Sequence, residues 1–482
     1  MFFCIFAMLM KDLKENIKKH KLHIAAILAL IASYCFFQFA YPYHLIRSEQ
    51  MNLFLFDWDY ISQTYKGIGW LSRLMSDFLE QFFHISMAGP LIIALLLTAI
   101  GSVVYKICHK HMSQKPSLAV AAILYFCSFM RETGNLYITR YTVATLGLLT
   151  VILLILQFKS IGTRLASALV LLTFGVWALG SPFHHNYGKF WGVPRINYDR
   201  VIGLDVEVAR ERWDKVLKLS KKDLYMVEAS YCYNLAHAMK GTLGQKYFNH
   251  SQNGDATLLL RVAPERTIFN NCLAGEAWFH LGSMTIAEQS AIIALQASPK
   301  HTGARFIVRL AQVNLISGED AAAQKYLNML SKTLFYRKWA KCMMPGLQDK
   351  STRTQLEQER SKLTDKDFVH HSNNPRTILI GLLDANPTNN LARNYLLCYD
   401  LLTYNLDLFM EDYAPNMIKA HIYHEAVLIW LSQHNRLTEQ NIAKFGIDKA
   451  LNAKMQWFFR NPDNYKDTYW YYYMNALEES EQ

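Results

Sequence analysis

The stretch "FGVWALGSPFHHNYGKFWGVPRINYDR", from Phe174 to Arg200, divides the sequence into two parts of different character. Before it, long hydrophobic runs dominate. After it, charged residues return at the density of ordinary soluble domains, and no long apolar run occurs again. The first part therefore predicts a membrane domain, and the second predicts a domain that folds in water.

Composition agrees with this division. The 482 residues leave room for two or three domains, and 51% hydrophobic with 18% charged residues leans toward a membrane protein. Up to Ser181 the chain has 15 Lys and Arg against 8 Asp and Glu, whereas the remainder has 35 against 31. The basic excess therefore lies mainly where Lys and Arg flank apolar segments, which indicates membrane topology. We expect a lipid bilayer as partner and no nucleic acid.

Five apolar segments approach the roughly 20 residues that a helix needs to cross a bilayer. The third is an uncharged run of only 14 residues. We predict a membrane domain over residues 1–183, with an outer loop at 42–85 and helices at 21–41, 86–105, 117–130, 136–158 and 165–183.

The distribution of Lys and Arg predicts the orientation of these helices. The segment "KDLKENIKKHK" before the first helix carries five Lys against two acidic residues and places the amino terminus in the cytoplasm. Five crossings then place everything after about Phe183 outside. If the two middle segments formed a re-entrant hairpin instead of two crossings, the number of crossings would stay odd. The C-terminal part would then still lie outside. We expect a multi-pass protein of the bacterial inner membrane with a periplasmic C-terminal domain.

From Pro182 onward the apolar residues recur with the 3.6-residue period of amphipathic helices, so the predicted fold class is all-α. Two stretches repeat with a period of 36 residues: Gly282 matches Gly318, and Ala287 matches Ala323. We expect each glycine at a turn between two helices and the small residue where the helices cross closely.

This pattern resembles a tetratricopeptide repeat. The small, aromatic, turn and terminating positions of that motif are matched by Gly275, Trp278, Gly282, Ala287, Ala291, Ala294 and Pro299. The resemblance implies a solenoid of stacked helix pairs over residues 184–482, which offers a concave surface to a peptide or protein partner. The next copy has Asn314 in place of the aromatic residue, and its spacing exceeds that of the family by two residues. An irregular helical bundle is the alternative.

The outer loop contains a candidate for chemistry. In "EQMNLFLFDWDY" two carboxylates, Asp57 and Asp59, lie two positions apart shortly after the first apolar helix, where they could bind a divalent metal or act as a base. The following segment "WLSRLMSDFLEQFFHI" predicts an amphipathic helix at the membrane interface. This order is similar to membrane glycosyltransferases that use lipid-linked sugars. Those enzymes have considerably more spans than five, and a solvated loop is the plainer interpretation.

A second candidate group is Arg131, Glu132 and Arg140, at the predicted outer ends of the third and fourth helices. Ionisable residues in such positions are often functional. An ion pair with long side chains reaching for the interface is the alternative interpretation.

No motif for a metal or a cofactor is present, and we predict neither. The eight cysteines form no CxxC pair. The histidines match no zinc-protease order, and no nucleotide-binding loop is complete.

The loop "YPYHLIRSEQMNLFLF" and the order of five apolar segments followed by helices also resemble an uncharacterised family of bacterial multi-pass membrane proteins, a domain of unknown function. That resemblance brings no activity with it. The sequence favours a membrane-anchored scaffold or binding protein, with a membrane glycosyltransferase-like enzyme as the alternative.

Overall fold

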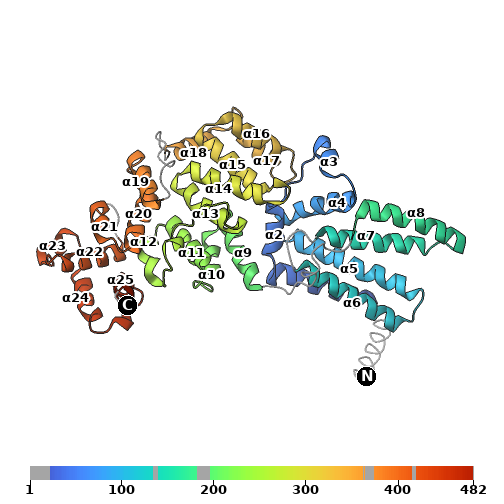
Figure 1. Cartoon of the computed structure of the whole chain (residues 1–482), viewed down its shortest axis with the longest axis horizontal. Helices are drawn as coiled ribbons and strands as arrows, with labels where there is room; N and C mark the ends of the chain where they lie inside the picture. The colour runs from blue at the N-terminus through green and yellow to red at the C-terminus, as the bar shows by residue number, and fades with distance from the viewer. Residues whose placement is uncertain are drawn as a thin grey trace, which may run out of the picture. The chain divides into compact units, whose positions relative to one another are not determined.

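The computed structural model describes residues 22–133, 139–181, 196–361, 363, 374–414 and 420–480. Every regular element in these ranges is a helix, and no strand occurs in them (Figure 1). The all-α fold is therefore confirmed. The lysine-rich segment before the first apolar helix lies outside the described residues.

The chain forms two compact units. The N-terminal unit comprises Met1–Asp199 together with two later segments, Thr302–Ala304 and Met329–Lys338, and the C-terminal unit comprises the remainder. Residues that lie far apart in sequence thus belong to the same unit, and the outer loop packs against the two later segments as described below.

Helices occupy all five apolar segments of the N-terminal unit. The helix Leu22–Ala40 ends in a π-helical turn, η1 (Phe36–Ala40). The other elements are α2 (Tyr43–Gln50), α3 (Trp58–Thr64), α4 (Trp70–Glu80), η2 (Gln81–His84), α5 (Ala88–His109), α6 (Gln114–Glu132), α7 (Thr139–Ile155) and α8 (Ile161–Leu179).

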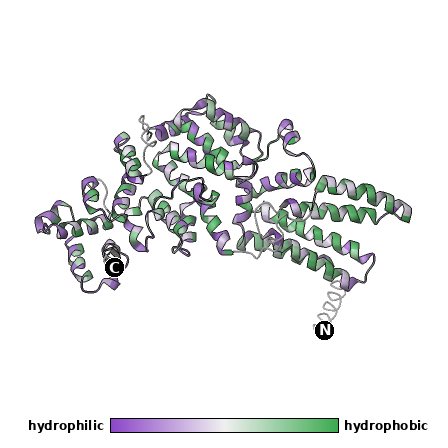
Figure 2. Cartoon of the chain, viewed as in Figure 1, coloured by the Kyte–Doolittle hydropathy of each residue, from purple (hydrophilic) through white to green (hydrophobic). Residues whose placement is uncertain are grey.

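Three of these helices, Leu22–Ala40, α5 and α8, are long and apolar enough to cross a membrane (Figure 2). Helix α7 is apolar but has only 17 residues. Helix α6 has 19 residues, and its ends carry Lys115, Arg131 and Glu132, which shortens its apolar centre. Five crossings therefore remain a prediction, while three helices qualify by length and composition alone.

Helix α5 is central to the packing of the N-terminal unit because it lies against both α6 and α7, and α7 in turn lies against α8. Its buried side chains Ile93, Leu97, Ile100 and Val104 recur at intervals of three and four residues, which places them on one face.

One large apolar core joins the first helices of the C-terminal unit, up to α14, to those from α19 onward. The helices of this unit are short. They are α9 (Ile196–Ala209, which begins in the N-terminal unit), α10 (Trp213–Ser220), α11 (Val227–Met239), α12 (Leu243–Lys246), α13 (Ile268–Leu281), α14 (Met284–Ala297), α15 (Ala304–Ser317), α16 (Asp320–Ser331), α17 (Arg337–Met343), α18 (Lys350–Arg360), α19 (Pro375–Ala385), α20 (Asn390–Leu402), α21 (Leu406–Asp412), α22 (His421–Gln433), α23 (Glu439–Lys444), α24 (Lys449–Phe458) and α25 (Tyr469–Ser480). Short 3₁₀ turns join some of them: η4 (Tyr247–Asn249), η5 (Asp255–Thr257), η6 (Pro299–His301) and η8 (Pro462–Tyr465).

Helices α13 and α14 pair as a hairpin, and α15 and α16 follow in the same register 36 residues later. A glycine ends the first helix of each pair: Gly282 has φ 95° and Gly318 has φ 80°, a left-handed conformation that glycine adopts without strain. Gly275 lets α13 approach α14 closely, because a β-carbon there would lie 2.3 Å from Ser290 Oγ.

Five consecutive aromatic residues, Tyr469–Tyr473, lie near the carboxyl end, and the first two belong to the core. Tyr469 and Trp470 are fully buried. The Tyr469 amide donates to Glu425 Oε2 at 2.7 Å, and the Trp470 indole donates to the Glu425 carbonyl at 3.0 Å. These bonds attach α25 to α22, so this part of the run acts in packing.

Candidate functional site

The outer loop places Asp57 at the start of α3. Asp57 has an extended backbone and accepts a hydrogen bond from the Tyr60 amide at 3.1 Å, so it is the N-cap of this helix. Its other oxygen pairs with the Lys332 ammonium at 2.5 Å. The bond to Lys332 and the Tyr60 amide together hold the pKa of Asp57 below its ordinary value.

Asp59 lies in the first turn of α3 and is exposed. Trp58 between the two carboxylates is 78% exposed. The pair predicted from the sequence is thus split, because Asp57 is engaged in a cap and an ion pair while Asp59 faces solvent.

Lys332 belongs to the segment Met329–Lys338, which packs against the outer loop inside the N-terminal unit. The Phe56 amide donates to the Lys332 carbonyl at 2.8 Å, and the Tyr336 hydroxyl donates to Glu49 Oε1 at 2.8 Å. Phe335 stacks on the His84 ring with centroids 5.1 Å apart. We name this set of contacts the loop clasp.

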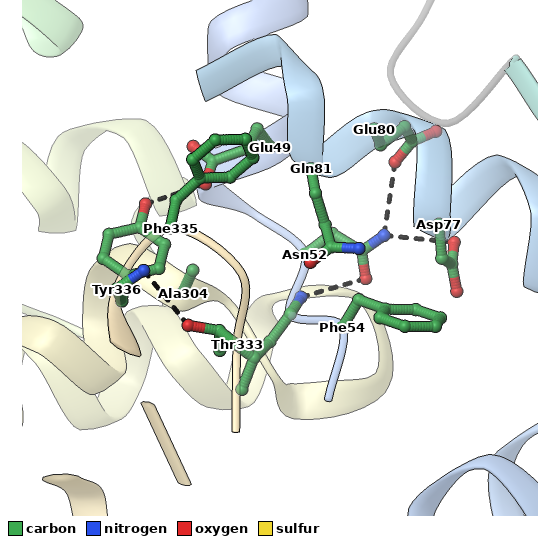
Figure 3. A pocket seen from close by; sticks show the side chains of 11 residues that line it. Glu49, Asn52, Phe54, Asp77, Glu80, Gln81, Ala304, Thr333, Phe335 and Tyr336 are labelled. Carbon is green, nitrogen blue, oxygen red and sulfur yellow. Dashed lines mark hydrogen bonds between the residues drawn. The ribbon is translucent and has the colours of Figure 1, made fainter. Parts of the chain in front are cut away.

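A small pocket lies at the loop clasp (Figure 3). Its polar wall comes from α2, α4 and the chain between α2 and α3, and its remaining wall from the later segments. The lining residues are Glu49, Asn52, Leu53, Phe54, Asp77, Glu80, Gln81, Ala304, Thr333, Phe335 and Tyr336.

The amide of Asn52 organises the acidic side of this pocket. It donates to Asp77 Oδ1 at 3.1 Å and to Glu80 Oε2 at 3.2 Å, as the dashed lines in Figure 3 show. The Tyr65 hydroxyl donates to Asp77 Oδ2 at 2.7 Å. Burial, with the nearby Asp77 carboxylate, raises the pKa of Tyr65. Tyr65 therefore remains a hydrogen-bond donor at any physiological pH.

The free space in the pocket is about 20 Å³, which is enough for one water molecule. In the described part of the chain, no group of three His, Cys, Asp or Glu side chains is placed to hold a metal ion. The carboxylates at the loop clasp are instead held by Asn52, Tyr65 and Tyr336, so the arrangement is chemically suited to joining segments of the chain.

Glu49, Asp77 and Glu80 were not predicted from the sequence. Asp77 and Glu80 lie on the polar face of α4, which sequence patterns normally assign to solvent. The structure reverses this assignment: Ser72, Ser76, Asp77 and Glu80 are buried, whereas Met75 and Phe78 of the apolar face are exposed. The apolar residues on the opposite face of α4, such as Met75 and Phe78, were the only sequence feature that could have suggested this reversal.

Arg131 and Glu132 are buried at the end of α6. The Arg131 guanidinium donates to Thr142 Oγ1 at 3.2 Å and to Thr145 Oγ1 at 3.1 Å, and the Thr142 hydroxyl donates to Glu132. Arg140 lies over the Tyr141 ring, 4.4 Å from its centroid. These bonds join α6 to α7.

A second buried polar cluster lies inside the C-terminal unit. Arg305 pairs with Asp205 at 2.7 Å and with Glu276 at 2.9 Å, and Arg309 pairs with the other oxygen of Glu276 at 2.5 Å. Burial alone would raise the pKa of Glu276, but Arg309 and Arg305 outweigh it and lower that pKa. The cluster balances two positive with two negative charges and joins α9, α13 and α15.

A model of a family of unknown function, DUF6057, matches residues 17–186 and 182–476. The chain belongs to this family. The match covers both the apolar helices and the C-terminal helices, so the two parts are characteristic of DUF6057 as a whole. No curated protein and no solved structure matches the chain.

Proposed function

We propose that this protein is a membrane-anchored scaffold whose C-terminal helices form a tetratricopeptide-like solenoid that binds a peptide or protein partner. One observation carries the proposal: α13 and α15 begin 36 residues apart, at Ile268 and Ala304, and a left-handed glycine follows each of them. Helix pairs in fixed register are the unit from which repeat scaffolds are built.

Three helices that qualify as spans support the membrane anchor. An odd number of crossings from a cytoplasmic amino terminus would place the C-terminal unit in the periplasm of a bacterium, whether three or five helices cross. Figure 2 shows hydrophobic residues along α5, α7 and α8. Exposed apolar side chains on α8, such as Val170, Phe174 and Trp177, are suited to contact with lipid.

The glycosyltransferase-like alternative requires Asp57 and Asp59 to act together at a cavity that admits a lipid-linked substrate. Asp57 instead caps α3 and pairs with Lys332, and the pocket at the loop clasp has room for one water molecule. No observation at the outer loop favours that alternative over the scaffold.

Site-specific photocrosslinking in living cells tests the scaffold. A photoreactive residue replaces Ile292, an exposed apolar side chain on α14, in the full-length chain. We expect one reproducible protein adduct from this position. The matched control replaces Lys159, which is exposed in the connection between α7 and α8 and should give no such adduct. If none of a panel of exposed positions on α14 and α16 gives an adduct, the scaffold proposal fails.

A further inference from the structure

Helix α18 has the properties of a ligand rather than of a core helix. None of its residues, Lys350–Arg360, is buried. It carries its own N-cap, because Asp349 accepts a hydrogen bond from the Thr352 amide at 2.7 Å. Arg353 and Glu357 lie four residues apart, where opposite charges support a helix. The sequence of α18 therefore favours a helix independently of the surface beneath it.

One side of this segment nevertheless rests on an apolar surface. Leu356 and Leu363 pack against a cluster of four buried side chains from α14 and α15. Leu356 lies in α18, and Leu363 follows the end of this helix at Arg360, where its amide donates to the Arg360 carbonyl at 2.9 Å. The Arg360 guanidinium fixes the position by donating to the Leu315 carbonyl at 2.8 Å. We name the four residues of this cluster the α18 seat: Met284, Ala287, Val313 and Ile316.

The α18 seat is apolar and is almost fully covered with α18 in place. Ala287 is 1% exposed, Val313 2% and Ile316 5%. All four side chains come from α14 and α15. An apolar surface of two helices that receives a leucine from a third, otherwise polar helix matches the way in which amphipathic peptides bind helical proteins.

We propose that the α18 seat is the docking site for an amphipathic helix with two leucines seven residues apart, and that α18 occupies this site within the chain until such a helix replaces it. The inference rests on the proposed function and specifies its binding surface and the kind of partner. Charged residues of both signs flank Leu356 and Leu363 in the sequence, so a partner helix that is soluble before binding fits the same surface.

The test uses the full-length chain in lipid nanodiscs and a fluorescein-labelled peptide of residues 348–363. In the variant Leu356→Asp, the charge placed against the apolar seat should release α18. We expect the peptide to bind this variant at least tenfold more tightly than the wild-type chain, because an occupied site lowers the apparent affinity by the fraction of chains in which it is free. A peptide that itself carries Leu356→Asp should not bind.

The matched control is Gln355→Asp, which adds the same charge to the exposed side of α18 and should bind the peptide like the wild type. Arg360→Ala is a milder second variant that removes only the bond to the Leu315 carbonyl, and it should bind with intermediate affinity. Circular dichroism of all variants verifies that the helices remain formed.

If neither Leu356→Asp nor Arg360→Ala binds the peptide more tightly than the wild type, α18 is a fixed part of the fold and the inference is wrong. That result does not bear on whether the photoreactive residue at Ile292 captures a partner, so the scaffold proposal would still stand. Conversely, peptide binding to Leu356→Asp with no crosslinked partner anywhere on α14 and α16 would confirm the docking site and contradict the scaffold proposal. The two proposals are thus tested separately.

Discussion

Asp57 and Asp59 have the same side chain and lie two positions apart, yet their environments differ. Asp57 accepts from the Tyr60 amide and pairs with Lys332, whereas Asp59 is exposed. We expect Asp57→Ala to lower the melting temperature of the full-length chain in detergent and Asp59→Ala to leave it unchanged, because only the first loses a helix cap. If Asp59→Ala abolished the cellular role of the protein while its melting temperature stayed the same, the enzyme alternative would regain support.

The sequence showed the acidic pair but not its division of roles. N-capping needs an extended backbone at Asp57, and the ion pair needs Lys332, which is 275 positions away. The residues next to Asp57 in the sequence determine neither its backbone conformation nor its pairing with Lys332. Arg131 and Glu132 stay a predicted functional group, and their threonine partners on α7 depend on how two helices pack against each other.

Two partly buried histidines, His237 and His250, give the C-terminal unit a predictable dependence on pH. Burial and, to a smaller extent, the neighbouring His237 lower the pKa of His250 to about 4. Burial and nearby lysines likewise lower the pKa of His237 to about 4. Both rings remain neutral in the folded chain when they would already be protonated in the unfolded chain below about 6.5. Their contribution to stability is therefore complete above pH 6.5 and is lost as the pH falls toward 4.

Thermal melts at pH 7.5 and pH 5.0 measure this effect. We expect His250→Gln to remove about 1 kcal/mol of the stability lost between these pH values, a figure reduced for partial solvent screening. His111→Gln, at an exposed position between α5 and α6, is the matched control and should melt like the wild type at both pH values. An unchanged pH dependence in His250→Gln would mean that this ring is accessible to protons in the folded chain.

At the scale of the elements, the 36-residue register predicted from Gly282 and Gly318 is present in the helix starts: α13 begins at Ile268 and α15 at Ala304, and both are followed by a left-handed glycine. The solenoid stays a proposal. Glycines and small residues are informative because they mark close approach of the backbone, which depends on few neighbours. Helix α4 shows the opposite case. Its periodicity predicted an amphipathic helix, but the period alone does not reveal which face is buried, and here the polar face packs inward.

The crossing of α13 and α14 is tested at Gly275. A β-carbon there would lie 2.3 Å from Ser290 Oγ and 2.7 Å from Ser290 Cβ, too close for a rotation of the hydroxyl to relieve. We expect Gly275→Ala to destabilise the unit by about 1–3 kcal/mol, as overpacking does.

Ser290→Gly removes the obstructing side chain but also its bond to the Asn271 carbonyl. The double variant should therefore be more stable than the sum of the two single changes allows, and chemical denaturation measures this coupling. Strict additivity would show that the helices separate to admit the methyl group.

At the scale of the whole molecule, the positions of the apolar helices were largely predictable because hydropathy is a local property summed over many residues. Helices lie at all five apolar segments, although α8 begins at Ile161 and ends at Leu179, four residues before the predicted start and end at 165 and 183. The loop clasp was not predictable. The membership of Met329–Lys338 in the N-terminal unit depends on contacts across more than 240 positions, such as Tyr336 with Glu49, and no periodicity encodes them.

The side of the membrane that holds the C-terminal unit is open to a direct test with paired reporters, alkaline phosphatase for the outside and green fluorescent protein for the cytoplasm. Three and five crossings both predict phosphatase activity at Gln482 and fluorescence at His111, because both models are odd in total and place the α5–α6 connection inside. They differ after Thr133, which lies outside if α6 crosses and inside if α6 and α7 do not. Fluorescence at Gln482 would require an even number of crossings, and the photocrosslinked partner of the scaffold would then have to be a cytoplasmic protein.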